Sequence, residues 1–513
     1  MLKRKLGLTS VAVVALSVAL AQPASAETLR EAIALAYQTN PNLLAQRANQ
    51  RALDESVVQA RAGLRPQVSA SGSVGYSRVW APNTSVTGTT DLDGDGFPDT
   101  TVIRGDSESD TADVGVSLSQ NIWTGGRTSL AIDAALANVL AGRENLRDIE
   151  QQVMVSAIQA YVNVTRDLEI LRIRQENLTV LQRQLEETSA RFEVGEITRT
   201  DVAQAEASLA QSQADLANAQ AQLSISRANY AAVVGQAPAN LEAAPILPPI
   251  PTEFEAALDA ALAANPGILA ATYNQQAAEA AVAQARAEYL PSARLAASYG
   301  ASTSNLGDLG ELADRQAFSA TASVSVPLFT GGLNRSRVAQ ALERANAAQI
   351  GVEGERRGVL QSVSSAYAQV LSAQSTLAAG EEAVRAASVA AEGVRQEAQV
   401  GLRTTLDVLQ QELTLRSSQV TLASARANEY VAKASLLAAM GRLGGPDLDP
   451  TLPAYDPAAN YEQVKGRGGL PWDGVVETLD RIGAPVVVET PDTADAPIDG
   501  QLKRQVVQTA PAS

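Results

Sequence analysis

The stretch VGLRTTLDVL at residues 400–409 separates two long runs of sequence that contain no proline. A related stretch, VGEITRTDVA at residues 194–203, lies 206 positions earlier and separates two runs of the same kind. The runs are rich in Ala, Leu, Gln, Glu and Arg, which favour helix, and each stretch contains a glycine, a residue that commonly ends helices. The sequence therefore predicts two helical hairpins that turn at these two stretches.

The two hairpins belong to two copies of one unit. Asn40-Pro41 recurs as Asn265-Pro266 at an offset of 225, whereas Trp123-Thr-Gly-Gly recurs as Phe329-Thr-Gly-Gly at an offset of 206. The offsets differ by 19 residues, so the first copy carries an insertion upstream of Trp123. Repeats at this spacing predict two copies of one structural unit, which we place at residues 27–245 and 252–445.

Each repeat is predicted to contain one very long helix, at about 127–194 and about 333–400. At 1.5 Å per residue each would be about 100 Å long, far more than a globular domain needs. Return helices are predicted at about 200–235 and 405–441. Apolar residues recur there every seven positions, as in coiled coils, with only Glu429 as an interruption: Val202, Leu209, Leu216, Leu223 and Tyr230, then Val408, Leu415, Leu422 and Leu436.

The segment before each long helix alternates apolar and small polar residues with period two, which predicts β-hairpins at about 67–123 and 292–329. In the first hairpin Val68, Ala70 and Val74 alternate with Ser69, Ser71 and Ser73. The strands have the length that a tilted strand needs to cross a bilayer. Four strands cannot close a membrane barrel, because at least eight are needed, so other subunits must complete it.

Composition removes most enzyme classes. The chain of 513 residues has no His and no Cys, which excludes His-based acid–base chemistry, thiolate nucleophiles and disulfides. Its net charge of −16 offers no basic surface for nucleic acid. An enzyme is therefore the least supported class, and no cofactor is expected apart from the calcium ion considered below.

The two ends of the chain differ from the repeats. Residues 1–26 have a basic start, an apolar run and the cleavage pattern Ala24-Ser25-Ala26, which predicts a secretory signal peptide. The apolar run is too short for a membrane-spanning anchor, the alternative reading. The C-terminal tail, residues 446–513, holds nine of the 22 prolines and little apolar periodicity, and we expect it to be mostly disordered.

The combination of duplicated strands, long helices and the motifs at 191–195 and 400–409 resembles the TolC family of outer-membrane channel-tunnel proteins. The resemblance implies an α+β membrane protein that forms a homotrimer with a twelve-stranded outer-membrane β-barrel, four strands from each chain. A long α-helical coiled-coil tunnel would continue from the barrel through the periplasm. The implied partners are outer-membrane lipid, a periplasmic adaptor protein and an inner-membrane transporter, either an ABC or a proton-driven one.

That resemblance implies that the chain is an outer-membrane exit duct, most simply one that passes proteins in type I secretion. A multidrug or small-molecule efflux pump is the alternative. A periplasmic coiled-coil scaffold or adaptor, a function of another class, would leave the four strands unexplained.

The resemblance also assigns roles to the helical turns, which would form the periplasmic tips. Asp407 matches the carboxylate of the family's aperture, and Arg403, Thr200 and Asp201 match the linkage that holds neighbouring coils closed. Ala398 and Gln410 stand where the family has a latch Tyr and a second aperture carboxylate. The alternative is that Asp201 and Asp407 are only helix-terminal charges. The tip residues implied to dock adaptors are Val194, Gly195, Val400, Gly401 and Leu402.

Two further sets of residues suggest local functions. The insertion contains a D-x-D-x-D-G pattern, typical of calcium loops, but Val102 replaces the bidentate Glu; a solvated acidic turn is the alternative. Its candidate ligands are Asp91, Asp93, Asp95 and Asp99. Aromatic residues at the strand ends predict membrane-interface positions, with packing against the helices as the alternative: Trp80, Trp123 and Phe329.

Overall fold

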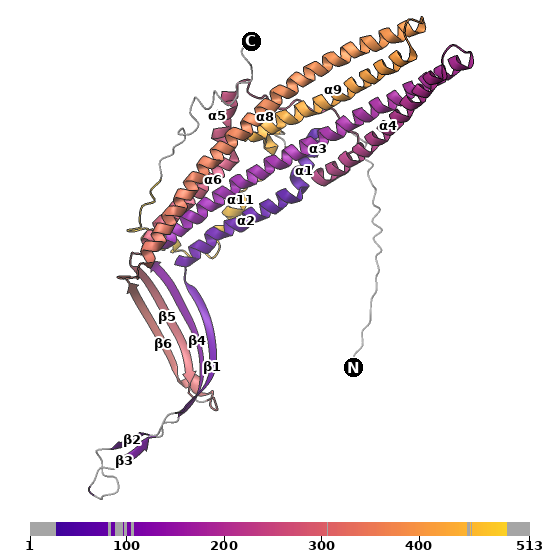
Figure 1. Ribbon diagram of the computed structural model, residues 1–513. Coiled ribbons are helices and arrows are strands. Elements are labelled where there is room, and N and C mark those ends of the chain that lie inside the picture. The colour runs from indigo at the N-terminus through magenta and orange to yellow at the C-terminus, as the bar shows by residue number, and fades with distance from the viewer. Residues whose placement is uncertain are drawn as a thin grey trace, which may run out of the picture.

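The computed structural model describes residues 27–80, 84–87, 96, 100–103, 107–304, 306–448, 452 and 454–489. Figure 1 shows an elongated molecule in which long paired helices lie at one end and a sheet at the other. The predicted signal peptide, residues 1–26, lies outside the described residues. Within the described ranges, none of the helices combines the length and the apolar character needed to cross a membrane.

Each repeat opens with a short and a longer helix, α1 (Leu29–Thr39) and α2 (Pro41–Arg61), then α5 (Phe254–Ala264) and α6 (Pro266–Ala287). The Asn of the repeated Asn-Pro pair caps the longer helix: Asn40 Oδ1 accepts the Asn42 N–H at 3.0 Å, and Asn265 Oδ1 accepts the Gly267 N–H at 2.9 Å. Their amide groups donate to carbonyls near the ends of the return helices, Val233 and Ala439. The dipeptide therefore joins two helices end to end.

The long helices are α3 (Arg127–Glu193) and α8 (Leu333–Gln399), and the return helices are α4 (Arg199–Val234) and α9 (Thr405–Ala439). Helix α4 packs along α3, and α9 packs along α8. In Figure 1 the two pairs run side by side to the two turns at the upper right. Because α2 and α4 meet end to end, as do α6 and α9, each long helix has a partner along nearly its whole length.

The largest apolar cores lie midway along the molecule, where α1 and α5 pack against the long helices. Two repeated tyrosines fix the segments that enter the repeats: the Tyr161 hydroxyl donates to the Glu27 carbonyl at 2.9 Å, and the Tyr367 hydroxyl donates to the Thr252 carbonyl at 2.5 Å. Toward the tips the core shrinks to small clusters of Leu and Ala. The tips therefore carry the least apolar packing in the helical region, which makes them the part best able to move.

The main sheet has the order β1-β4-β5-β6 and is antiparallel throughout, with β1 (Gln67–Val79), β4 (Ser107–Trp123), β5 (Ser292–Thr303) and β6 (Gln316–Ser325). Its register aligns one apolar row across all four strands, Ala70, Val116, Tyr299 and Phe318. The neighbouring row is polar, Ser69, Ser117, Ser298 and Ser319, and its hydroxyls pair at 2.8 and 2.9 Å.

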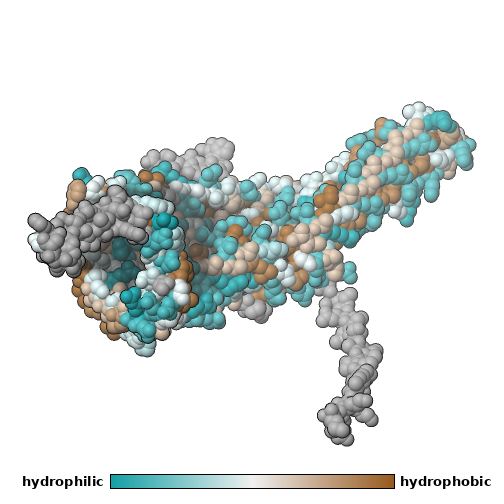
Figure 2. Space-filling model, turned by 90° about the horizontal axis from the view of Figure 1, so that it is seen from below, coloured by the Kyte–Doolittle hydropathy of each residue, from teal (hydrophilic) through white to brown (hydrophobic). Residues whose placement is uncertain are grey.

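The sheet thus has one apolar and one polar face, as the alternation predicts. The apolar side chains are exposed in the single chain; Val74, for example, is 74% exposed. Figure 2, seen from the sheet end, shows a hollow with mainly hydrophilic surroundings and hydrophobic residues gathered on its outer edge. Strands β1 and β6 are the two edges of the sheet and are the places where further strands can join.

The additional residues of the first repeat extend its hairpin beyond the main sheet. Strands β2 (Thr84–Thr87) and β3 (Thr100–Ile103) pair with each other and lie past the end of β1 in Figure 1. In the second repeat a single-turn helix, α7 (Glu311–Asp314), connects β5 to β6. The predicted calcium ligands Asp91, Asp93, Asp95 and Asp99 lie outside the described residues.

The expectation of a mostly disordered tail is wrong for its described part. Helices α10 (Gly445–Leu448), α11 (Ala459–Val464) and α12 (Asp473–Asp480) pack against the first repeat. Leu452, Val464 and Val476 are buried, with exposures of 8%, 4% and 7%. These buried residues lie twelve positions apart, too far from one another to give a helical or strand period in the sequence, and the prolines of the tail lie outside α11 and α12.

Candidate functional site at the helical tips

Each long helix ends in the same tight turn. Gly195 and Gly401 adopt left-handed φ angles of 80° and 79°, which only glycine adopts without strain. A Cβ added at either position would meet no atom within 4 Å, so the glycines are needed for the backbone angle and not for space. The Glu196 and Leu402 N–H groups then donate to the carbonyls of Arg191 and Glu397, both at 2.9 Å. These bonds close the end of the long helix and reverse the chain in a few residues.

Each return helix begins with the same capping box. Thr198 and Thr404 are the N-caps, and the side chains of Asp201 and Asp407 accept hydrogen bonds from the Thr N–H at 2.9 and 3.0 Å. The backbone N–H of Thr404, followed by its hydroxyl, donates to Asp407 and holds the pKa of this carboxyl below its usual range. The Thr198 hydroxyl and N–H lower the pKa of Asp201 in the same way. Within one chain, both carboxylates therefore bind the first turn of their own helix.

The predicted linkage between the tips is not made inside one chain. The Arg403 guanidinium donates to Glu397 of its own tip at 2.8 Å, and this bond raises its pKa. In the first repeat Arg191 pairs with Glu196 at 3.0 Å. Among the bonds of the described residues, none joins Arg403 to Thr200 or Asp201.

The residues predicted to dock an adaptor lie on the surface of the two turns. Val194, Val400 and Leu402 are exposed by 74%, 72% and 75%, a high value for apolar side chains. Beside them, α3, α4 and α9 enclose a groove of about 260 Å³. Its lining combines leucines with amides and hydroxyls, including Leu181, Ser208, Leu406 and Gln410. The tips thus offer apolar side chains next to a mixed groove, a surface that suits another helix.

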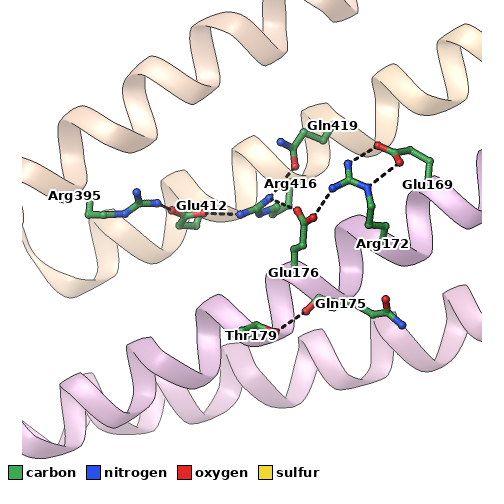
Figure 3. Close-up of polar contacts among 9 residues, drawn as sticks. All are labelled: Glu169, Arg172, Gln175, Glu176, Thr179, Arg395, Glu412, Arg416 and Gln419. Atoms are coloured by element: carbon green, nitrogen blue, oxygen red, sulfur yellow. Dashed lines mark hydrogen bonds and ion pairs between the residues drawn. The ribbon is translucent and has the colours of Figure 1, made fainter.

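An ion network with a buried carboxylate at its centre, which the sequence analysis did not identify, lies behind the tips and joins three helices (Figure 3). Glu412 of α9, 3% exposed, accepts from Arg395 of α8 and lies 3.7 Å from Arg416 of its own helix. Arg416 also lies 3.6 Å from Glu176 of α3. Arg172 pairs with both Glu169 and Glu176 on α3. The network therefore ties the second helical hairpin to the first.

The aromatic residues at the strand ends have different surroundings. Trp80 and Phe329 are 72% and 91% exposed, as expected for side chains that contact a surrounding medium. Trp123 is half-buried, and its indole N–H donates to the Ile482 carbonyl of the tail at 3.0 Å. Its position therefore includes packing against the tail, a contact that neither the membrane-interface prediction nor its alternative, packing against the helices, included. In the described parts of the chain no cluster of three or more acidic residues suits a metal ion.

Two helical hairpins on a two-faced sheet with open edges define a subunit of an outer-membrane channel-tunnel. The model of the outer membrane efflux protein family matches residues 32–236 and 257–442. Its two segments correspond to the two repeats. The chain belongs to this family, whose members are passive outer-membrane channels, and it is an outer-membrane protein that extends into the periplasm.

Relatives and solved structures agree with this assignment. The chain is 34% identical over 446 residues to the outer membrane efflux protein BepC of Brucella suis, and the alignment covers 87% of this chain and 92% of BepC. It is 27% identical to the outer membrane protein TolC of Escherichia coli, over 82% of this chain and 84% of TolC. It is 26% identical to the alkaline protease secretion protein AprF of Pseudomonas aeruginosa, over 61% of this chain and 66% of AprF. The crystal structure of VceC from Vibrio cholerae superposes with a TM-score of 0.64 at 23% identity, covering 80% of this chain and 96% of that one. The chain is thus similar to outer-membrane components of tripartite export systems.

Proposed function

We propose that the chain forms, as a homotrimer, the outer-membrane exit duct of a tripartite export system. The observation that carries this proposal is the sheet with two unpaired edges, β1 and β6, and an apolar row that crosses all four strands. Three copies would join these edges into a closed twelve-stranded barrel, which satisfies the backbone groups in the bilayer. The paired helices of three copies would then enclose the periplasmic part of the tunnel.

In this assembly the tips contact the rest of the system. The exposed Val194, Val400 and Leu402 and the groove beside them would receive a periplasmic adaptor, which connects the duct to an inner-membrane transporter. Asp407 would lie near the axis three times and form the aperture. Arg403 would reach Thr200 and Asp201 of the neighbouring chain and hold the entrance closed.

Protein substrates of type I secretion, delivered by an ABC transporter, are the cargo that we assign to the duct. The similarity to a relative named for alkaline protease secretion supports this assignment. Small-molecule efflux by a drug pump is the second candidate, and it is supported by the 34% identical relative named an efflux protein. A periplasmic scaffold or adaptor, the third function considered, gives no role to the membrane-facing sheet.

Deletion of the gene tests the cargo assignment. The culture supernatant of the deletion strain is expected to lack one or more secreted proteins by mass spectrometry, and a plasmid copy of the gene should restore them. Drug susceptibility is measured on the same strains. An unchanged supernatant with raised drug susceptibility would replace secretion by efflux, and a strain unchanged in both would contradict the export function.

A further inference from the structure

The described part of the tail forms a C-terminal strap, residues 454–488, that runs along the first repeat to the end of the sheet. The Arg47 guanidinium lies 4.8 Å from the ring centroid of Tyr455 and 4.3 Å from the ring centroid of Tyr37. The Asn460 amide donates to the buried Asp54 carboxylate at 2.8 Å, and Arg65 pairs with Asp473 at 2.8 Å. The strap thus provides partners for buried polar groups of α2 and places α12 at the junction of helix and sheet.

Asp480 of the strap binds the first turn of α3. The Asp480 carboxylate, fully buried, accepts the Ser129 N–H at 3.1 Å and the Thr124 N–H at 2.5 Å, together with both hydroxyls. The N-cap residue of α3 is Gly126, which has no side chain to fill this role. Asp480 therefore acts as the missing cap and fixes the position of α12 against the junction.

Helix α12 is amphipathic, but its charged residues face the protein and its apolar residues face outward. Asp473 and Asp480 are paired as described, and Glu477 lies 3.5 Å from Arg481, which is itself bound to Asp133. The outward side is an apolar stripe of one residue per turn, which we call the α12 stripe: Trp472, Val475, Leu479 and Ile482, exposed by 49%, 63%, 41% and 61%. A helix that faces water would have the opposite arrangement.

The α12 stripe lies where the hydrocarbon layer would end. Helix α12 packs on β4, whose last residue, Trp123, donates to the Ile482 carbonyl. One end of β4 and β1 therefore adjoins both α12 and the polar long helices. The apolar pair Val68 and Leu118, which are cross-strand neighbours near this end, is 68% and 40% exposed. Exposed apolar surface thus continues from the sheet end to the helix.

We propose that α12 is an interfacial helix whose stripe enters the inner leaflet of the outer membrane, at the level of the lipid headgroups and upper acyl chains. A short helix with Trp and aliphatic residues on one side suits that boundary. A second copy of the chain would join at the edge strands, whereas β4, which carries α12, is an inner strand. The inference rests on the proposed membrane-spanning assembly of the sheet.

Spin labelling of single cysteines in the full chain, reconstituted in phospholipid vesicles, tests the proposal. The chain has no cysteine of its own, so Val475→Cys and Leu479→Cys each give one labelled site. Collisions of the label with oxygen, which concentrates in lipid, are compared with collisions with a water-soluble nickel complex. We expect oxygen collisions to dominate at both sites of the stripe, at a shallow depth.

Two control sites separate this inference from the proposed function. Val74→Cys, on the exposed sheet, should show the lipid pattern at greater depth, and Val389→Cys, 66% exposed on α8, should show the water pattern. Nickel collisions at 475 and 479 would overturn the proposal, and weak collisions with both reagents would assign the stripe to a second copy instead. A water pattern at 74 would contradict the membrane assembly itself.

Discussion

Asp201 and Asp407 make the same bonds in the two repeats, so local chemistry does not distinguish them. Each carboxylate accepts hydrogen bonds from the N–H and the hydroxyl of its capping threonine, and those bonds lower its pKa. The sequence supports both readings of Asp407, as a helix-terminal charge and as an aperture group. The structure shows the first within one chain, and the second depends on where three chains bring the carboxylate.

This identity gives a matched pair of variants. Asp407→Ala and Asp201→Ala each remove one capping carboxylate, and the resulting loss of helix stability should be similar. If only Asp407 lies at the aperture, only Asp407→Ala should relieve block of the channel by a trivalent cation and lower its cation preference. Single-channel conductance in planar bilayers measures both effects. Equal changes in cation block and cation preference in the two variants would show that Asp407 has no special place at the aperture.

The lowered pKa of Asp407 also sets a pH window for its capping bond. A carboxyl whose folded pKa is depressed contributes stability that is complete above its unfolded value of 3.8 and is lost as pH falls through the folded value. The helix start at Thr404 should therefore be insensitive to pH from neutrality down to about pH 4. Amide hydrogen exchange at residues 404–408 measures this. Loss of protection already near neutral pH would indicate a raised pKa in the assembly.

At the scale of the elements, the ion network links three helices: Glu412 of α9 binds Arg395 of α8, and Arg416 of α9 lies 3.6 Å from Glu176 of α3. Glu412→Gln removes the carboxylate shared by Arg395 and Arg416 and leaves both cations without it. We expect a loss of about 1–3 kcal/mol in the stability of the helical region, together with a higher conductance because α9 is less firmly tied to α8. Thermal melting followed by circular dichroism in detergent, and bilayer recordings, measure the two effects.

Glu382→Gln is the matched control for that variant. Glu382 pairs with Arg385 on the surface of the same hairpin, with side-chain exposures of 63% and 68%, and such pairs contribute little. The control should melt and conduct like the unaltered chain. If Glu412→Gln also leaves both properties unchanged, the Glu412 carboxylate has no part in holding α8 and α9 together.

Elements with a strong period could be predicted from sequence, and single buried charges could not. The long helices, the return helices and the alternating strands follow from proline-free runs, heptads and period-two patterns. Glu412 lies three positions from both Leu409 and Leu415 of α9, but no sequence feature separates it from the exposed acidic residues. Its burial depends on α8 and α3, which approach it from distant parts of the chain.

At the scale of the whole molecule, the strap makes the two repeats unequal. In the first repeat Asp480 caps α3 and the strap covers Trp123, whereas in the second repeat Leu328 and Phe329 are 93% and 91% exposed. The tail escaped prediction because each of its segments buries only one or two apolar residues. Its bonds depend on partners more than 300 residues away in sequence, such as Arg65 and Asp133.

Loss of the Asp480 cap should release the strap. Asp480→Ala leaves the Ser129 and Thr124 N–H groups without their buried acceptor, a loss of about 1–3 kcal/mol. Trypsin should then cleave faster after Lys465, Arg467 and Arg481, as measured by the masses of the fragments. Glu477→Ala, which removes a half-exposed charge from the same helix, should keep the original cleavage rate. Equal rates for Asp480→Ala and the unaltered chain would show that the cap does not hold the strap.

The assembly itself can be tested at the two edges of the sheet. If copies join β1 to β6, a cysteine at Ser323 on β6 should form an intermolecular disulfide with one of Ser69→Cys, Ser71→Cys or Ser73→Cys on β1, and the product on a denaturing gel should be a covalent trimer. The absence of native cysteine removes competing bonds. Ser117→Cys replaces the β1 cysteine in the control; because β4 is an inner strand, it should give no covalent trimer. A ladder that ends at two or four copies would change the stoichiometry, and a chain that remains monomeric in detergent with every pair would contradict closure of the sheet by neighbouring copies.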